Sequence, residues 1–209
     1  MSVGGTWRDT NESRLARWML FVDGENFTIR AERHAANTGL NLQEGPYYSP
    51  DSFVWMPRYK GYTNIYGSDV PWELQPRAIR ANYYASVWGD APKVFSVREA
   101  LWNLGFQPKV FKKIRRDEKA KGVDIRLTTD LLVGAYRDIY DVAVLITGDG
   151  DYVPLVEEVK GLGKLVYVAF IKDKPTAGLS SELCLASDVV PSEFERTFRM
   201  MWKSYRPNN

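Results

Sequence analysis

Short strand-like segments, most of them rich in apolar residues, alternate with longer helix-like segments along most of the chain. The apolar runs at residues 18–22 and 141–147 have the length of strands that are buried on both faces of a sheet. The segments predicted as strands cover residues 18–22, 81–88, 106–111, 141–147 and 164–170, with a short sixth at 188–190. The segments predicted as helices cover residues 25–36, 92–104, 123–139 and 151–162. This alternation favours an α/β fold in which helices cover both faces of a parallel sheet.

Residues 39–76 interrupt the alternation and show no clear periodicity. A structureless loop of this length is unusual inside a domain, so we expect an insertion with some structure of its own, such as a hairpin. Its aromatic residues are Tyr47, Tyr48, Phe53, Trp55, Tyr59, Tyr62, Tyr66 and Trp72. We expect these rings to pack onto the domain, and stacking on unpaired bases is the alternative.

A last helix is predicted at about residues 192–205, beginning at the capping-box pattern Ser192-x-x-Glu195. One apolar stripe, predicted to pack against the core, contains Phe194, Phe198, Met201, Trp202 and Tyr205. With the insertion and this helix, residues 1–209 are predicted to form a single domain. Either addition also offers a surface for a second copy of the chain or for a protein partner.

The composition limits where the protein works and which residues can do chemistry. No stretch approaches the roughly 18 apolar residues of a membrane span, so we expect a cytoplasmic protein with no membrane partner. Cys184 is the only cysteine, which excludes an intrachain disulfide and a Cys-rich zinc site. His34 is the only histidine and is predicted to be solvated on the surface of the first helix. Chemistry must therefore come mainly from carboxylates, lysines and a hard metal ion.

Positive charge is concentrated in one segment, although the net charge of the chain is only +2. Between Lys109 and Arg126 there are eight Lys or Arg residues against three acids. Such a stripe indicates an anionic partner at one place on the surface, and a solvated loop is the alternative. The candidates for contact with nucleic-acid phosphates are Lys112, Lys113, Arg115, Arg116, Lys119 and Lys121.

Four aspartates are expected to meet at the carboxyl edge of the predicted sheet, where parallel sheets bind their ligands. Asp23 follows the first strand, Asp149 and Asp151 follow the fourth, and Asp124 lies at the amino end of a helix near that edge. Each could instead be a turn, cap or helix-dipole residue. Crowded together they would repel one another, and a divalent cation with oxygen ligands relieves that repulsion. Mg²⁺ or Mn²⁺ fits best.

Two further polar residues lie near these aspartates in sequence. Asn26 is in the first helical turn after Asp23, where its amide could orient a carboxylate or a water molecule, or simply begin the helix. Asp130 is six residues after Asp124 and faces elsewhere on the helix, so a structural or supporting role is expected.

Three motifs occur in series along the chain: Phe21 to Asn26 (FVDGEN), Lys121 to Asp124 (KGVD) and Thr147 to Leu155 (TGDGDYVPL). Together they resemble the NYN domain, a branch of the PIN-like metal-dependent nucleases, and the resemblance extends over about residues 17–190. The resemblance implies a PIN-like three-layer sandwich with five parallel strands in the order 3-2-1-4-5. That order places the ends of the first and fourth strands side by side.

The resemblance also implies a Mg²⁺- or Mn²⁺-dependent ribonuclease acting on single-stranded or structured RNA. Carried over by motif position, the metal or catalytic carboxylates would be Asp23, Asp124, Asp149 and Asp151, with Asn26 in support. The intact acidic positions favour an endoribonuclease over a non-catalytic RNA-binding adaptor. A DNA nuclease stays an alternative, because no residue can be identified from the sequence as recognising the 2′-hydroxyl of RNA. The basic stripe argues against a small-molecule phosphatase.

Overall fold

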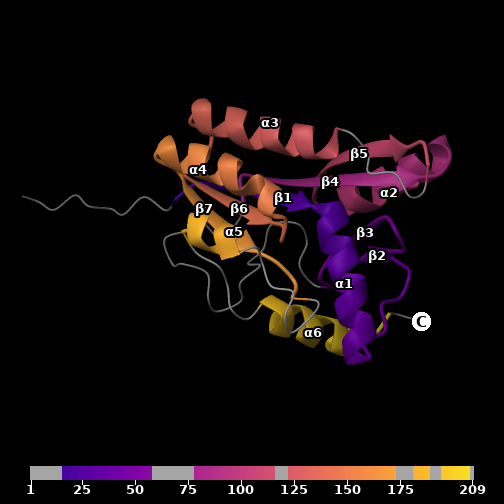
Figure 1. The fold of residues 1–209 in the computed structure, drawn as a ribbon. Helices are drawn as coiled ribbons and strands as arrows, with labels where there is room; N and C mark the ends of the chain where they lie inside the picture. Colours follow the sequence, from indigo (N-terminus) through magenta and orange to yellow (C-terminus); the bar gives the residue numbers. More distant parts are fainter. Residues whose placement is uncertain (1–15, 58–77, 116–121, 173–180, 189–193, 208–209) are drawn as a thin grey trace, which may run out of the picture.

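Five parallel strands form a central sheet between two layers of helices (Figure 1). The computed structural model describes residues 16–57, 78–115, 122–172, 181–188 and 194–207. The strands are β1 (Trp18–Asp23), β4 (Arg80–Trp88), β5 (Gln107–Lys113), β6 (Val142–Ile146) and β7 (Leu165–Ala169). Their spatial order is β5-β4-β1-β6-β7, which confirms the predicted α/β fold and its 3-2-1-4-5 arrangement. β1 is therefore paired with β4 on one side and with β6 on the other.

The helices cover both faces of the sheet, as Figure 1 shows. The residues of one apolar core come from α1 (Gly24–Thr38), α2 (Ala91–Asn103) and α6 (Phe194–Ser204) together with the sheet. The other core is built with α3 (Val123–Tyr136), α4 (Val153–Gly161) and α5 (Ser181–Ala186). Of the helices in the described ranges, none is both long enough and apolar enough to cross a bilayer.

Two helix boundaries differ from the prediction. α3 ends at Tyr136 rather than at residue 139, because Asp138 adopts a left-handed conformation (φ 51°) that turns the chain toward β6. The segment predicted as a helix from residue 151 begins with a 3₁₀ turn, η2 (Gly150–Tyr152), before α4. The short helix α5 was not predicted, since six residues are too few to show a helical period.

The described part of the insertion forms a small hairpin that packs onto the domain, as predicted. Its strands are β2 (Tyr48–Ser49) and β3 (Phe53–Val54), and the next residue, Trp55, is fully buried. The Tyr83 hydroxyl from β4 donates to the Val54 carbonyl (2.9 Å) and accepts from the Val54 N–H (3.3 Å). Four aromatic residues of the insertion, Tyr59, Tyr62, Tyr66 and Trp72, lie outside the described residues.

The apolar stripe of α6 packs against α1, which confirms its predicted role in the core. Phe198 and Trp202 are buried, and the rings of Phe198 and Phe27 lie 6.1 Å apart in an edge-on arrangement. Of the capping-box pair, Ser192 lies outside the described residues. Glu195 accepts a hydrogen bond from the Lys172 N–H (2.9 Å), so its carboxylate ties α6 to the segment after β7.

Two further predictions need correction. His34 is buried rather than solvated, because α6 returns over α1 and places Phe198 against the imidazole ring (6.4 Å between centroids). Its Nδ1 lies 3.2 Å from the Lys172 carbonyl. Asp188 forms a bend instead of starting a sixth strand, with its Oδ2 accepting from the Val166 N–H (2.7 Å). Residues 189–190 lie outside the described ranges.

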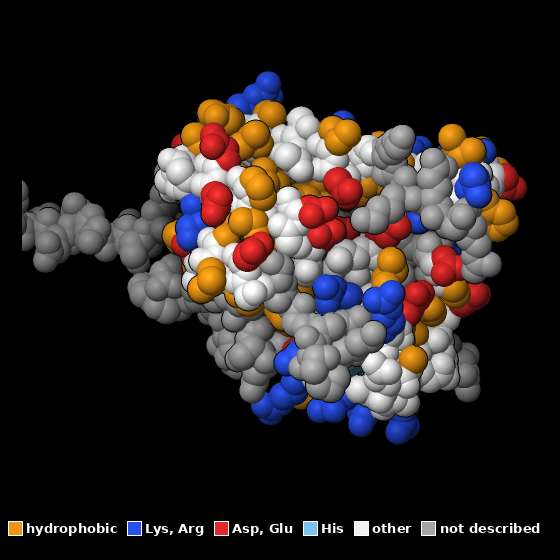
Figure 2. All heavy atoms as spheres, in the orientation of Figure 1, with side chains coloured by type: hydrophobic (Ala, Val, Ile, Leu, Met, Phe, Trp, Pro, Cys, Tyr) orange, Lys and Arg blue, Asp and Glu red, His pale blue; other side chains and the backbone are white. Residues whose placement is uncertain are grey.

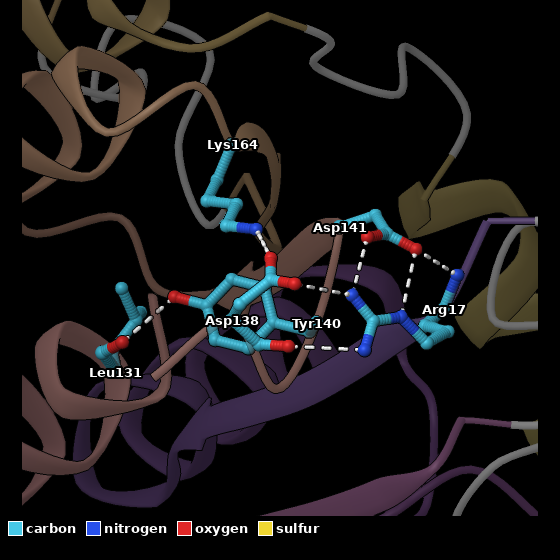
Figure 3. A network of polar contacts seen from close by, with 6 residues as sticks. All are labelled: Arg17, Leu131, Asp138, Tyr140, Asp141 and Lys164. Carbon is cyan, nitrogen blue, oxygen red and sulfur yellow. Dashed lines mark hydrogen bonds and ion pairs between the residues drawn. The ribbon is translucent and has the colours of Figure 1, made fainter. Parts of the chain in front are cut away.

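A network of paired charges ties the strands together at the amino edge of the sheet (Figure 3). Arg17 donates to both carboxylate oxygens of Asp141 (2.8 and 3.1 Å) and to the Asp138 carbonyl (3.0 Å). Lys164 pairs with the Asp138 side chain. The hydrogen bonds from Arg17 hold the pKa of Asp141 below its usual value. The charged side chains at this edge therefore form ion pairs with one another. The aspartates that are candidates for a catalytic role lie at the opposite edge.

Candidate active site

Asp23 is the last residue of β1, at the centre of the carboxyl edge of the sheet. Its Oδ1 accepts the Asn26 N–H (3.2 Å), so Asp23 also caps α1. The helix can begin this close to β4 only because residue 24 is glycine: a Cβ there would lie 2.2 Å from the Tyr83 ring and 2.5 Å from the Tyr84 carbonyl. The strand-to-helix turn thus buries Asp23, whose exposed fraction is 4%.

A chain of hydrogen bonds joins Asp23 to Asp149. The Thr147 hydroxyl donates to Asp23 Oδ2 (2.9 Å) and accepts the Asp149 N–H (3.2 Å). This arrangement is possible because β6 lies directly beside β1, with Ile146 opposite Val22 in the register. The predicted meeting of the ends of the first and fourth strands is therefore present, and Thr147 sets the spacing between the two aspartates.

Asn26 and Arg30 brace the loop that carries Asp149. Asn26 Oδ1 accepts hydrogen bonds from the Gly148 N–H (3.0 Å) and from Arg30 Nε (3.0 Å). Arg30 also donates to the Gly148 carbonyl (3.3 Å). The backbone N–H and C=O of Gly148 are therefore both hydrogen-bonded, the first to Asn26 and the second to Arg30. The side chain of Asn26 thus orients the backbone of the loop after β6.

Asp124 reaches the same place from the start of α3. The helix begins after Gly122, whose φ of 123° favours glycine. The Tyr152 hydroxyl donates to Asp124 Oδ1 (3.1 Å). Burial, together with the charges of Asp23, Asp124 and Asp149, raises the pKa of Tyr152, which keeps the hydroxyl protonated as a donor.

The electrostatics of the site are dominated by the burial of Asp23. Desolvation raises the pKa of this carboxyl to about 7, against hydrogen bonds from Asn26 and Thr147 that lower it. The negative charges of Asp124 and Asp149 raise it further. A buried carboxylate that faces two others is therefore only partly ionised at neutral pH unless positive charge reaches it.

Asp151 and Asp130 are placed differently from these three aspartates. Asp151 is exposed, and its backbone N–H donates to Asp149 Oδ1 (3.1 Å), which caps the 3₁₀ turn η2. Asp130 accepts from the Tyr84 hydroxyl (3.1 Å) and from Arg126 (2.9 Å), as a structural residue would.

Figure 2 shows acidic side chains gathered near the middle of the face of the molecule that is turned toward the viewer, where α1, α3 and α4 converge in Figure 1.

The donor chemistry of Asp23, Asp124 and Asp149 fits a hard divalent cation, since carboxylate oxygens are the ligands that Mg²⁺ and Mn²⁺ prefer. Desolvation and like charge oppose ionisation of Asp23, and both effects would be offset by a cation. Within the described residues, however, no three His, Cys, Asp or Glu side chains are close enough together to hold a metal ion as they stand. The four-aspartate metal site therefore stays a prediction.

Only part of the basic stripe lies in the described residues. Lys112 and Arg115 are exposed at the end of β5, whereas Lys113 is partly buried and forms an ion pair with Glu25 (2.8 Å). The other oxygen of Glu25 accepts from the Ser86 hydroxyl (2.8 Å). The remaining candidates, Arg116, Lys119 and Lys121, lie outside the described residues.

Four residues at this edge were not predicted from the sequence as site residues: Glu25, Arg30, Thr147 and Tyr152. Thr147 and Tyr152 lie within the TGDGDYVPL motif, so their positions beside Asp149 were a usable signal. Arg30 is one helical turn after Asn26, which places both side chains on one face of α1. Glu25 lies within the FVDGEN motif, but its partners Ser86 and Lys113 come from β4 and β5, and the motif does not indicate those contacts.

Comparison with known proteins supports the fold that these residues build. Residues 17–192 match the family defined as the NYN domain. The structure is similar to the crystal structure of a protein of unknown function from Vibrio parahaemolyticus, with a TM-score of 0.57 and 23% sequence identity. That match covers 85% of this chain and 92% of the Vibrio chain. None of the curated proteins compared with the chain matches it.

Proposed function

The chain belongs to the NYN domain family, and on that premise we propose that it is a divalent-metal-dependent endoribonuclease that hydrolyses RNA phosphodiester bonds. Membership of this family indicates a nuclease-like function related to RNA. The observation that carries the finer proposal is the buried Asp23, which is electrostatically coupled to Asp124 and Asp149 at the carboxyl edge of the sheet. NYN and PIN-like nucleases typically use divalent metals, in agreement with this all-oxygen donor set.

The proposed mechanism assigns distinct work to the residues of the edge. A bound Mg²⁺ or Mn²⁺ would lower the pKa of a water molecule and neutralise charge on the phosphoryl oxygens. Asp23, Asp124 and Asp149 would hold the ion, with Asp151 as a further candidate ligand. Thr147 and Tyr152 fix the carboxylates of Asp23 and Asp124 through hydrogen bonds.

The phosphates of the substrate require positive charge outside this acidic centre. We propose that Lys112 and Arg115 contact them, together with Arg116, Lys119 and Lys121 from the neighbouring loop. Lys113 has a different role in this proposal, because its ion pair with Glu25 already satisfies its charge. It keeps the Glu25 carboxylate from repelling the substrate backbone next to Asp23.

The purified protein should cut labelled RNA in the presence of Mn²⁺ and should stop when EDTA is added. The assay uses single-stranded RNA, structured RNA and single-stranded DNA of one sequence. Internal cleavage of RNA supports the endoribonuclease, and faster cleavage of the DNA would make the protein a DNA nuclease instead. If all three substrates stay intact while RNA is bound, the non-catalytic adaptor replaces the enzyme.

Replacing Lys112, Arg115 and Arg116 with Ala should weaken RNA binding for every sequence tested, since interactions with phosphates do not distinguish bases. The slope of log K against log salt should flatten by up to about 0.7 for each phosphate of a single strand that is no longer neutralised. Binding titrations at several salt concentrations measure this slope. The control is Arg98→Ala: Arg98 donates to the Val110 carbonyl from α2 and should leave the slope unchanged. An unchanged slope in the triple variant would reduce the stripe to a solvated loop.

A further inference from the structure

A cleft of about 1040 Å³ opens beside the acidic centre, at the ends of β4 and β5. One wall is a single face of α1, formed by Glu25, Thr28, Ile29 and Glu32, and residues 50–52 of the hairpin extend it. The opposite wall runs from Ser86 through Trp88 to Lys93 and includes Lys112 to Ile114. The volume of the cleft is at the upper end of the range for small-molecule sites, so a nucleotide fits inside.

The cleft begins at the candidate active site itself. Glu25, in its wall, is two residues after Asp23 in the first turn of α1. Ser86, in the other wall, is two residues beyond Tyr84, which pairs with Asp23 in the sheet register. A strand of RNA whose scissile phosphate lay at Asp23 would therefore have its neighbouring nucleotide at the mouth of this cleft.

Trp88 is the largest exposed apolar residue of the cleft, with an exposed fraction of 55%. It ends β4, and Ile114, across the end of β5, is also exposed. An exposed indole in a cleft beside lysines is the arrangement by which proteins stack unpaired bases while holding the backbone. Trp88 belongs to neither apolar core of the described residues, so packing in those cores does not account for its position.

The charges of the cleft suit a base inside and phosphates at the rim. Glu32 accepts from the Tyr48 hydroxyl (3.0 Å) and the Asp51 N–H (3.2 Å), and Asp90 caps α2 through the Lys93 N–H (3.0 Å). These carboxylates disfavour a phosphate within the cleft but can accept from the amino groups of bases. Lys112 is exposed, and Lys93 donates to the neutral Ser49 hydroxyl (3.3 Å).

We propose that this cleft is the subsite for one unpaired nucleotide of the RNA substrate, with its base stacked on Trp88 and its phosphates near Lys93 and Lys112. The inference deepens the proposed endoribonuclease and rests on it for the identity of the polymer. A base can reach the face of Trp88 only when it is neither paired nor stacked on its neighbours. The cleft thus makes the protein selective for single-stranded RNA over duplex RNA.

The test is RNA binding in EDTA, which separates recognition from cleavage. Fluorescence anisotropy with a short labelled single strand, and with the same strand annealed to its complement, gives both affinities. Trp88→Ala should weaken single-strand binding roughly 5- to 150-fold, the effect of about 1–3 kcal/mol per stacked base, and should leave the weak duplex binding unchanged. Trp88→Tyr, which keeps an aromatic face, should recover most of the loss.

The matched control is Trp102→Ala. Trp102 is 65% exposed and lines a separate pocket of about 410 Å³ at the opposite ends of β4 and β5. Its removal should not change the affinity for either RNA. If Trp88→Ala and Trp102→Ala bind the single strand equally well, or if wild type prefers the duplex, the subsite is refuted.

The two proposals can fail separately. Binding that depends on Trp88, without metal-dependent cleavage by the wild type, keeps the subsite and overturns the endoribonuclease. Cleavage by the wild type with an unchanged Kd and KM in Trp88→Ala keeps the enzyme and overturns the subsite.

Discussion

Single replacement of Asp23, Asp124 or Asp149 by Asn is expected to lower RNA cleavage by orders of magnitude in each case. The three carboxylates come from β1, α3 and the loop after β6, yet they interact at one edge of the sheet. Charge neutralisation and positioning are shared in such a site, so losing any one member disables the whole. Single-turnover cleavage of labelled RNA with Mn²⁺ measures the effect.

Combining these substitutions should add little to the loss, as for other residues that act as a unit. RNA binding should survive or strengthen, because negative charge facing the phosphates is removed. The control is Asp130→Asn on the same helix as Asp124, since Asp130 bonds to Tyr84 and Arg126 rather than to the other aspartates. A variant of Asp23, Asp124 or Asp149 that cleaves at the wild-type rate would remove that residue from the site.

The fold could be predicted from the sequence because the signals that define it are local. Most strands of the sheet contain a short apolar run, and the helices between them show apolar positions at helical spacing; β5, with the sequence QPKVFKK, is the exception among the strands. Features that depend on long-range packing could not be found in this way. His34 is polar and lies in a helix, but α6, about 160 residues later in the chain, covers it. Nothing within the sequence of α1 indicates that packing.

The site was predictable to the extent that it follows from strand order. Asp23 and Asp149 are brought together because β1 and β6 are neighbours, and the motifs with the implied order were enough to expect this. The orientation of each side chain in a tight turn was not predictable. In the 3₁₀ turn Gly150–Tyr152, Tyr152 points to Asp124 while Asp151 is exposed. One residue along the chain therefore separates a buried partner of the site from a solvated carboxylate.

The stability of the metal-free protein is expected to fall as pH rises from about 4 to about 7, through the ionisation of Asp23. The folded state raises the pKa of this carboxyl from 3.8 to about 7, chiefly by desolvation. Between these values the folded protein keeps a proton that the unfolded chain has released, so raising the pH favours unfolding. At about 1.4 kcal/mol per pKa unit, the resulting loss in the free energy of unfolding is absent below pH 4 and approaches about 4 kcal/mol above pH 7.

Asp23→Asn tests this effect, because an amide keeps the shape of the side chain and cannot ionise. The amide also replaces one of the two oxygens that accept hydrogen bonds from Asn26 and Thr147, and that change contributes equally at every pH. In EDTA, the free energy of unfolding of the variant minus that of wild type should therefore rise from about pH 4 to about pH 7, measured by urea titration at several pH values. Asp151→Asn, which changes an exposed carboxylate of the same edge, should leave the wild-type pH dependence in place. Mn²⁺ should stabilise the wild type more at pH 8 than at pH 5, since a cation favours the ionised carboxylate. A difference between Asp23→Asn and wild type that stays flat from pH 5 to pH 8 would show that Asp23 ionises normally, and the electrostatic argument for a cation at this edge would fall with it.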